Sequence, residues 1–109
     1  MEYTDIKVGG YYYLKNNSYE YYFECDTKPK MDNSNDYCFQ STEGHIWVDQ
    51  DDKEIIFDKD YQYFDECDEY DMSKARELTF SEIAWLKACK KANELVSKPI
   101  VEATNYSIF

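Results

Sequence analysis

The chain has 109 residues, which is enough for one small domain with a single core and too short for a second domain. Its formal net charge of −11 disfavours nucleic acid and anionic membrane surfaces as direct partners, because both attract basic proteins. The charge favours a basic protein partner, or it serves solubility alone. It indicates no particular oligomeric state.

The N-terminal sequence MEYTDIKVGG has neither a basic start nor an apolar core, so we expect no signal peptide. No stretch approaches the apolar length that spans a bilayer. No two cysteines have CxxC spacing, and His45 is the only histidine, so the pattern does not indicate a zinc site. We therefore expect a cytoplasmic protein with reduced, buried thiols at Cys25, Cys38, Cys67 and Cys89.

The first part of the chain predicts a β-hairpin. Residues 6–15, IKVGGYYYLK, form a strand that a glycine pair interrupts with a turn or bulge. Residues 19–25, YEYYFEC, form a second strand, whose alternation is typical of a sheet with one buried face. The Asn-Asn-Ser sequence at 16–18 provides the turn between them.

Short strands separated by polar turns continue the pattern. A polar loop is predicted over 26–36, and strands are predicted at 37–41, 45–48, 53–57 and, as a short strand or a helical turn, 61–64. Strands at intervals of about ten residues suggest a small antiparallel barrel or a curled sheet.

The hydrophobic period then changes to that of an amphipathic helix, predicted over 80–96. Thr79 and Glu82 form a capping box that starts it, and a proline after Ser97-Lys98 ends it. The side chains expected to face the sheet are Trp85, Leu86, Cys89 and Leu95.

The fold class that follows is α+β: a small, strongly bent antiparallel sheet or partial barrel of about five or six strands, with one C-terminal amphipathic helix packed on it. Residues 1–109 form a single domain with an acidic β-rich part (1–72), a helical part (79–97) and a tail (98–109), in which 100–109 form one more strand or an extended segment.

Residues 49–71, DQDDKEIIFDKDYQYFDECDEYD, contain eleven acidic residues and two lysines. The acids alternate with seven isoleucine, phenylalanine and tyrosine residues, which a disordered acidic tail lacks. We infer that a folded framework holds these carboxylates in a fixed array. The charge is uneven, because residues 1–72 carry nineteen acidic and six basic residues, and 73–109 carry four acidic and six basic ones.

Catalytic and metal-binding patterns are absent from the sequence. It has no G-x-S-x-G elbow, no glycine-rich phosphate loop and a single histidine, so we expect no enzyme and no cofactor. An enzyme would need a cleft around His45 and Cys38. As a calcium loop beginning at Asp49, the chain would place Lys53 and Glu54 where an oxygen ligand and a glycine are required, so no dedicated metal site is expected.

The acidic array is itself a candidate binding surface. Duplex DNA carries a phosphate charge about every 1.7 Å of its axis, and carboxylates on neighbouring strands, about 4.8 Å apart, approximate that density. Exposed tyrosines would add contact area. The predicted partner-binding residues are Asp49, Asp51, Asp52, Asp58, Asp60, Tyr61, Tyr63, Asp65, Glu66, Asp68, Glu69, Tyr70 and Asp71. The alternative is that the acids form a solvated face and the tyrosines belong to the core.

Residues 76–93, RELTFSEIAWLKACKKAN, resemble a pattern, R-E-[AT]-T-x-x-E-[IL]-x-W-L-x-A-C-x-x-A-[GN], of small acidic proteins encoded by bacteriophages and phage-derived elements. The matching positions are Arg76, Glu77, Thr79, Glu82, Ile83, Trp85, Leu86, Ala88, Cys89, Ala92 and Asn93. The sequence departs at Leu78 and Phe80, where the pattern more often has Ala and Pro. In such proteins a short β-rich part precedes the helix.

Small acidic phage proteins include inhibitors of host defence, of the anti-CRISPR and DNA-mimic type. The resemblance therefore implies an inhibitor, located in the host cytoplasm, that binds the basic nucleic-acid-binding surface of a host defence nuclease. The alternative class is a non-catalytic interaction or phage assembly module, which would use a sheet edge or the lysine-bearing face of the helix.

Overall fold

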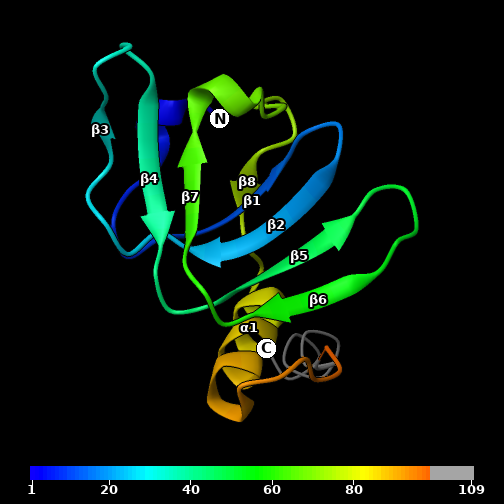
Figure 1. Ribbon diagram of the computed structural model, residues 1–109. Coiled ribbons are helices and arrows are strands. Elements are labelled where there is room, and N and C mark those ends of the chain that lie inside the picture. The colour runs from blue at the N-terminus through cyan, green and yellow to red at the C-terminus, as the bar shows by residue number, and fades with distance from the viewer. Residues whose placement is uncertain (99–109) are drawn as a thin grey trace, which may run out of the picture.

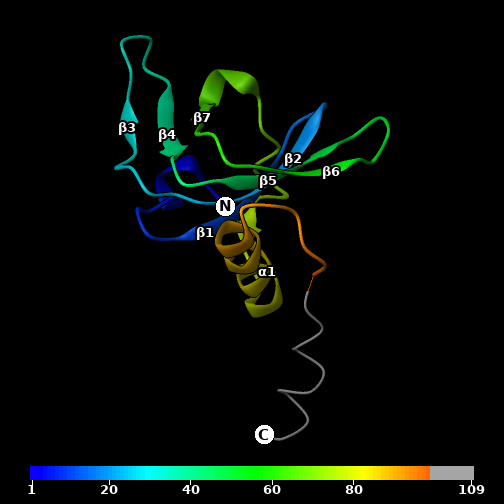
Figure 2. The ribbon, with the colours of Figure 1, turned by 60° about the horizontal axis from the view of Figure 1, so that its bottom comes forward.

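The computed structural model describes residues 1–98, which form three layers (Figure 1). The elements in chain order are η1 (Tyr3–Asp5), β1 (Tyr11–Lys15), β2 (Tyr19–Glu24), β3 (Lys30–Met31), β4 (Tyr37–Ser41), β5 (His45–Asp49), β6 (Ile55–Asp58), β7 (Gln62–Asp65), η2 (Glu66–Asp68), β8 (Arg76–Glu77) and α1 (Phe80–Ala92). A three-stranded sheet and α1 lie on opposite sides of a five-stranded sheet (Figure 2). The predicted α+β class, antiparallel strands followed by a C-terminal helix, is confirmed.

The strands divide between two open sheets. The five-stranded sheet has the order β6-β5-β2-β1-β8, and the three-stranded sheet has the order β3-β4-β7. The chain leaves the larger sheet after β2, returns to it at β5, and crosses again to β7. These three crossings are the connections at residues 25–29, 42–44 and 59–61.

The β1–β2 hairpin forms the centre of the larger sheet. The side-chain oxygen of Asn16 accepts hydrogen bonds from the N–H groups of Ser18 and Tyr19, at 3.0 and 2.9 Å, and so closes the predicted turn. Burial alternates along β2 as predicted, with Tyr21 and Phe23 buried, but the opposite face is half-buried because α1 packs on it. On the helix side, the Tyr22 ring packs edge-on against Trp85, with centroids 5.4 Å apart.

Three phenylalanines join the two sheets. Phe23 of β2 stacks on Phe64 of β7 with centroids 4.2 Å apart, and Phe39 of β4 lies 5.9 and 5.3 Å from these two rings. Each ring is at most 2% exposed. Burying one such side chain stabilises a fold by roughly 1.5–3 kcal/mol, so this stack fixes the position of the smaller sheet on the larger one.

Helix α1 begins as predicted and ends earlier than predicted. The Thr79 hydroxyl accepts the Glu82 N–H at 3.2 Å, and the Glu82 carboxylate accepts the Thr79 N–H at 2.9 Å, which completes the capping box. The last helical residue is Ala92, because Asn93 adopts the left-handed conformation with φ 57°.

After Asn93 the chain folds back on the helix. The indole N–H of Trp85 donates to the Val96 carbonyl at 2.7 Å, and the Val96 N–H donates to Cys89 Sγ at 3.4 Å. Trp85, Cys89 and Leu86 are buried against the sheet, as predicted. The same prediction is wrong for Leu95, which is 43% exposed because it follows the end of the helix.

The four cysteines are free thiols, and three of them are buried as predicted. Cys67 is exposed, contrary to the prediction, because it lies in η2 at the surface. Within residues 1–98, no helix has the length and apolar character needed to cross a membrane. The strand or extended segment predicted over 100–109 lies outside the described residues.

Candidate partner-binding surface

Many of the acidic residues form the turns in which they lie. In each case the aspartate Oδ1 accepts the backbone N–H two residues further on, at 2.8 to 3.1 Å. This bond occurs at Asp32, Asp49, Asp52, Asp58, Asp65 and Asp71. Hydrogen bonds from Cys67 lower the pKa of Asp65, and those from Ser73 lower the pKa of Asp71. The Asp65 and Asp71 carboxylates are therefore both fixed in position and anionic at neutral pH.

Three turns follow one another along one end of the molecule (Figure 1). The N–H of Gln50, in the β5–β6 turn, donates to the Ser18 carbonyl of the β1–β2 turn at 2.9 Å. Asn16, in the same β1–β2 turn, donates through its side-chain amide to the Asp68 carbonyl in η2 at 3.4 Å. The acids of the β5–β6 turn and of η2 thus belong to one continuous edge.

The β3–β4 turn extends this edge with two acids that the sequence analysis did not single out, Asp32 and Asp36. The β4–β7 pairing places them beside η2, where the Glu66 carboxylate accepts the Tyr37 N–H at 2.9 Å. Burial, together with the charges of Asp32, Asp65 and Glu66, raises the pKa of Asp36. The two acids precede the acidic run in the sequence and join it only through strand pairing.

We call this edge the acidic rim. It comprises Asp32, Asp36, Asp49, Asp51, Asp52, Glu54, Asp65, Glu66, Asp68, Glu69 and Asp71. Within it, Asp36, Asp65 and Cys67 offer ligand atoms within 4.8 Å of one another. Calcium takes 6–8 oxygen ligands, so these three groups do not by themselves form a calcium site.

Two predicted acids, Asp58 and Asp60, lie away from the rim. Asp58 is the cross-strand partner of His45, at the opposite end of the β5–β6 pair from Asp49. The stretch 49–71 therefore does not form one array, because successive turns along an antiparallel pair fall at opposite ends of it.

The three predicted tyrosines differ in how exposed they are. Tyr61 and Tyr63 are exposed, by 65% and 40%. Tyr70 is 7% exposed, so the expectation that it is a surface residue is wrong. Its ring packs against Tyr21 and Phe64, at centroid distances of 6.2 and 6.0 Å, and covers the end of the core between the sheets. Burial raises the pKa of its hydroxyl.

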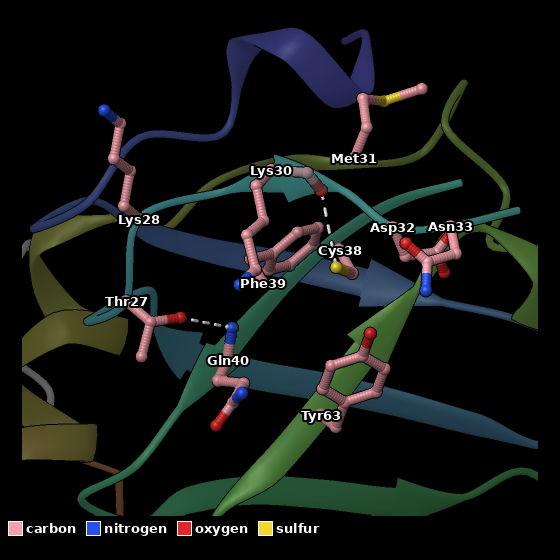
Figure 3. A pocket seen from close by; sticks show the side chains of 10 residues that line it. All are labelled: Thr27, Lys28, Lys30, Met31, Asp32, Asn33, Cys38, Phe39, Gln40 and Tyr63. Carbon is pink, nitrogen blue, oxygen red and sulfur yellow. Dashed lines mark hydrogen bonds between the residues drawn. The ribbon is translucent and has the colours of Figure 1, made fainter. Parts of the chain in front are cut away.

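A hollow of about 660 Å³ lies along β3, β4 and β7 and is lined by both lysine and polar side chains. Figure 3 shows the hydroxyl of Tyr63 directed toward Asp32 and Asn33, and the Cys38 thiol donating to the Lys30 carbonyl at 3.3 Å. Cys38 lines this hollow and His45 does not. The structure thus does not place these two residues in a common cleft.

His45 is instead enclosed, with 1% of its surface exposed. Neither ring nitrogen has a hydrogen-bond partner in geometric range among the described residues. Burial lowers its pKa, and the nearby Asp58 carboxylate and Asp60 backbone offset this only in part. The imidazole is therefore neutral at pH 7.

An aromatic hollow of about 240 Å³ opens on the part of the larger sheet that the smaller sheet leaves uncovered. Its lining residues come from four strands and are Tyr19, Tyr21, Trp47, Asp58 and Gln62. The Tyr19 and Trp47 rings meet edge to face, with centroids 5.4 Å apart and planes at 80°. The alternation in β2 placed Tyr19 and Tyr21 on one face, but nothing local in the sequence indicates that β5, β6 and β7 complete a hollow there.

Comparison with protein-family models, curated proteins and solved structures finds no match to this chain. The resemblance of residues 76–93 to phage proteins stays a prediction, and a function has to be argued from the surface itself.

Proposed function

We propose that this protein binds a basic, nucleic-acid-binding surface of another protein through the acidic rim, and thereby keeps nucleic acid from that surface. The observation that supports the proposal is the alignment of two acidic segments, the β5–β6 turn and η2, which the Gln50–Ser18 and Asn16–Asp68 hydrogen bonds join through the uncharged β1–β2 turn. A third acidic segment, the β3–β4 turn containing Asp32, continues the alignment through the β4–β7 pairing. The result is a row of carboxylates on a rigid backbone.

A rigid row of carboxylates suits a site that normally holds phosphates. The aspartates that close the turns lose little further freedom on binding, which reduces the entropic cost of association. Displacing counterions from a basic groove favours the complex in the same way as it favours binding of DNA. Such an interaction depends on charge and should weaken as salt rises.

Some carboxylates of the rim have no role in forming the turns. Among the described residues, the carboxylates of Asp51, Glu54 and Glu69 accept no hydrogen bond and form no ion pair, so the fold does not use them. Gathering unpaired like charges at one edge destabilises a compact state. Solubility requires charge on the protein, but it does not require that the charge be concentrated at one edge.

The resemblance to phage proteins narrows the proposed partner. If the chain is phage-encoded, the partner is a host defence nuclease whose basic channel normally holds nucleic acid, and the inhibitor acts in the host cytoplasm. This step rests on the class of protein alone, so it is separate from the proposal that the rim binds a basic surface.

The direct test is affinity capture from host lysate at low salt, followed by binding measurements with the purified partner. We expect a nucleic-acid-binding protein whose affinity for the chain falls steeply between low and high salt, and whose nucleic acid competes with the chain. Recovery of only unrelated basic proteins, or a complex that is insensitive to competing nucleic acid, would contradict the proposal.

A second candidate is an assembly module that uses β6, which is an edge strand of the larger sheet among residues 1–98. Ile55 in this edge strand is 43% exposed, and it borders an apolar hollow of about 360 Å³ with Leu95 and Val96. The lysine-bearing face of α1 is less suited, because Lys90 pairs with Glu24 at 2.9 Å. Binding through the β6 edge would change little with salt, which distinguishes it from binding through the rim.

A further inference from the structure

The aromatic hollow has the features of a receptor for a cation. Its rings are set at steep angles, with Tyr19 lying 6.1 Å from Tyr21 at 55° and 5.4 Å from Trp47 at 80°. Asp58 adds a carboxylate to the wall, and Gln62 adds an amide. Several aromatic faces together with one anionic group form the usual environment for an organic cation in a protein.

The chain supplies no cation of its own to this hollow within the described residues. Where cations of this chain lie over aromatic rings, they do so on the helix side of the sheet: Arg76 lies 4.8 Å from the Tyr13 ring and Lys87 lies 5.7 Å from the Tyr11 ring. The described ion pairs involve Glu24 and Glu82 and leave Asp58 without a cationic partner. The hollow is therefore electron-rich, and no cationic side chain among residues 1–98 lines it.

The buried histidine behind the hollow leaves the Asp58 charge available. His45 is the cross-strand partner of Asp58, and its ring lies 6.1 Å from that of Tyr21. A protonated imidazole there would neutralise the carboxylate, but burial lowers the pKa of His45 and keeps it neutral at pH 7. The Asp58 carboxylate also accepts the Asp60 N–H at 2.9 Å, which fixes its orientation.

We propose that this hollow binds the guanidinium group of an arginine side chain from the basic protein partner. The volume, about 240 Å³, is below the roughly 300–1,000 Å³ of pockets for drug-sized ligands, and it suits the end of one side chain. Arginine fits better than lysine, because a planar guanidinium stacks on aromatic rings while it donates to a carboxylate.

The hollow is also well placed for this role. Tyr19 and Trp47 share the sheet face of Asp49, because Tyr19 is directly opposite Asp49 in the register and Trp47 lies two residues before it. One wall of the hollow thus borders the acidic rim, and the opposite wall carries Asp58. The inference rests on the proposed function, since it requires a basic partner, and it adds a specific contact to the general attraction of the rim.

The test is a titration of the ¹⁵N-labelled full chain with the peptide acetyl-Gly-Arg-Gly-amide. The NMR signal of the Trp47 indole N–H is monitored at each peptide concentration. We expect a saturable shift at millimolar concentrations, and little shift with the citrulline peptide, which is nearly isosteric and uncharged. The Trp85 indole, bonded to the Val96 carbonyl, should not move and serves as the internal control. The same peptide with lysine in place of arginine should also produce a smaller shift. An equal response to the citrulline peptide or the lysine peptide, or no response to the arginine peptide, overturns the proposal.

Two variants with the same change in charge complete the test. Asp58→Asn retains an oxygen that can accept the Asp60 N–H, and it should weaken binding of the arginine peptide about ten-fold. Asp60→Asn alters an exposed neighbour that does not line the hollow, and it should leave binding unchanged. Equal effects of the two variants would overturn the proposal. Because the Trp47 signal reports on the hollow and partner capture is measured separately, failure here is distinguishable from failure of the proposed binding through the rim.

Discussion

Arg76 holds Glu82 through two parallel hydrogen bonds, from Nη1 to Oε1 at 2.7 Å and from Nη2 to Oε2 at 2.8 Å. The pair joins β8 to the first turn of α1, and the Glu82 side chain is 6% exposed. The same carboxylate accepts the Thr79 N–H of the capping box. One buried charge thus connects the edge of the larger sheet, the start of the helix and the helix cap.

This pair should make the protein sensitive to acid. Burial alone would raise the pKa of Glu82, but the hydrogen bonds from Arg76 and Thr79 and the Arg76 charge lower it to about 2, against 4.5 for an unperturbed glutamate. The carboxylate therefore stabilises the fold above pH 4.5, by up to roughly 3 kcal/mol, and this contribution is lost as the pH falls toward 2.

The check is urea denaturation of the wild type and Glu82→Gln at several pH values. Glutamine can still cap the helix, but it cannot titrate. The variant should be less stable at pH 7, and the difference from wild type should shrink toward pH 2. A difference that stays constant with pH would show that the charge of Glu82 contributes nothing.

The buried histidine should produce a second pH dependence at higher pH. Burial lowers the pKa of His45 in the folded state below the ordinary histidine value of 6.5, so the unfolded chain takes up the proton first as the pH falls. The free energy of unfolding is then unaffected by His45 above pH 6.5 and declines below it, with a limiting slope of about 1.4 kcal/mol per pH unit.

His45→Leu isolates this effect, because both proteins retain every carboxylate. At pH 7 the variant should be about as stable as wild type, since removing an unpartnered buried imidazole removes a desolvated polar group. Between pH 6.5 and 5 the variant should gain stability relative to wild type. Parallel stability curves for the two proteins would mean that His45 is protonated equally in the folded and unfolded states.

The tyrosines provide a third test, because two of them should behave in opposite ways. Tyr70→Ala removes a ring from the core and should cost roughly 3–5 kcal/mol of stability. Tyr61→Ala removes a ring that is 65% exposed and should change stability by less than about 0.5 kcal/mol. Thermal or urea unfolding measures both effects. A large loss of stability for Tyr61→Ala would assign that residue to the fold instead of to a contact surface.

The sequence was sufficient to predict elements that local interactions define. The β1–β2 turn follows from Asn16, and the start of α1 follows from Thr79 and Glu82, because each bond closes within a few residues. The end of α1 was misplaced, since Val96 continues the helical apolar period but reaches its partners by folding back. Asn93 was the local signal for the true end.

The candidate site depended on contacts between distant parts of the chain. Asp32 belongs to the acidic rim only because β4 pairs with β7, and Asp58 leaves it only because β6 runs antiparallel to β5. Tyr70 was expected to be a surface residue because its neighbours are acidic, yet its ring closes the core. Charge density along the sequence therefore indicated an acidic surface and most of its members, but not that Asp32 and Asp36 join it or that Asp58 and Asp60 lie away from it.

The central claim, that the acidic rim binds a basic partner, is tested most directly by two matched sets of charge reversals. The rim set is Asp51→Lys, Glu54→Lys and Glu69→Lys, and the control set is Glu43→Lys, Glu77→Lys and Glu94→Lys. All six carboxylates are exposed and accept no hydrogen bond among the described residues, and both sets change the net charge equally.

The measurement is the dissociation constant for the captured partner at low salt, with circular dichroism to confirm the fold of each variant. We predict that the rim set weakens binding by at least about ten-fold and reduces its salt dependence, while the control set stays close to wild type. Equal weakening by the two sets would show that only net charge matters. Unchanged binding by the folded rim variant would contradict the account.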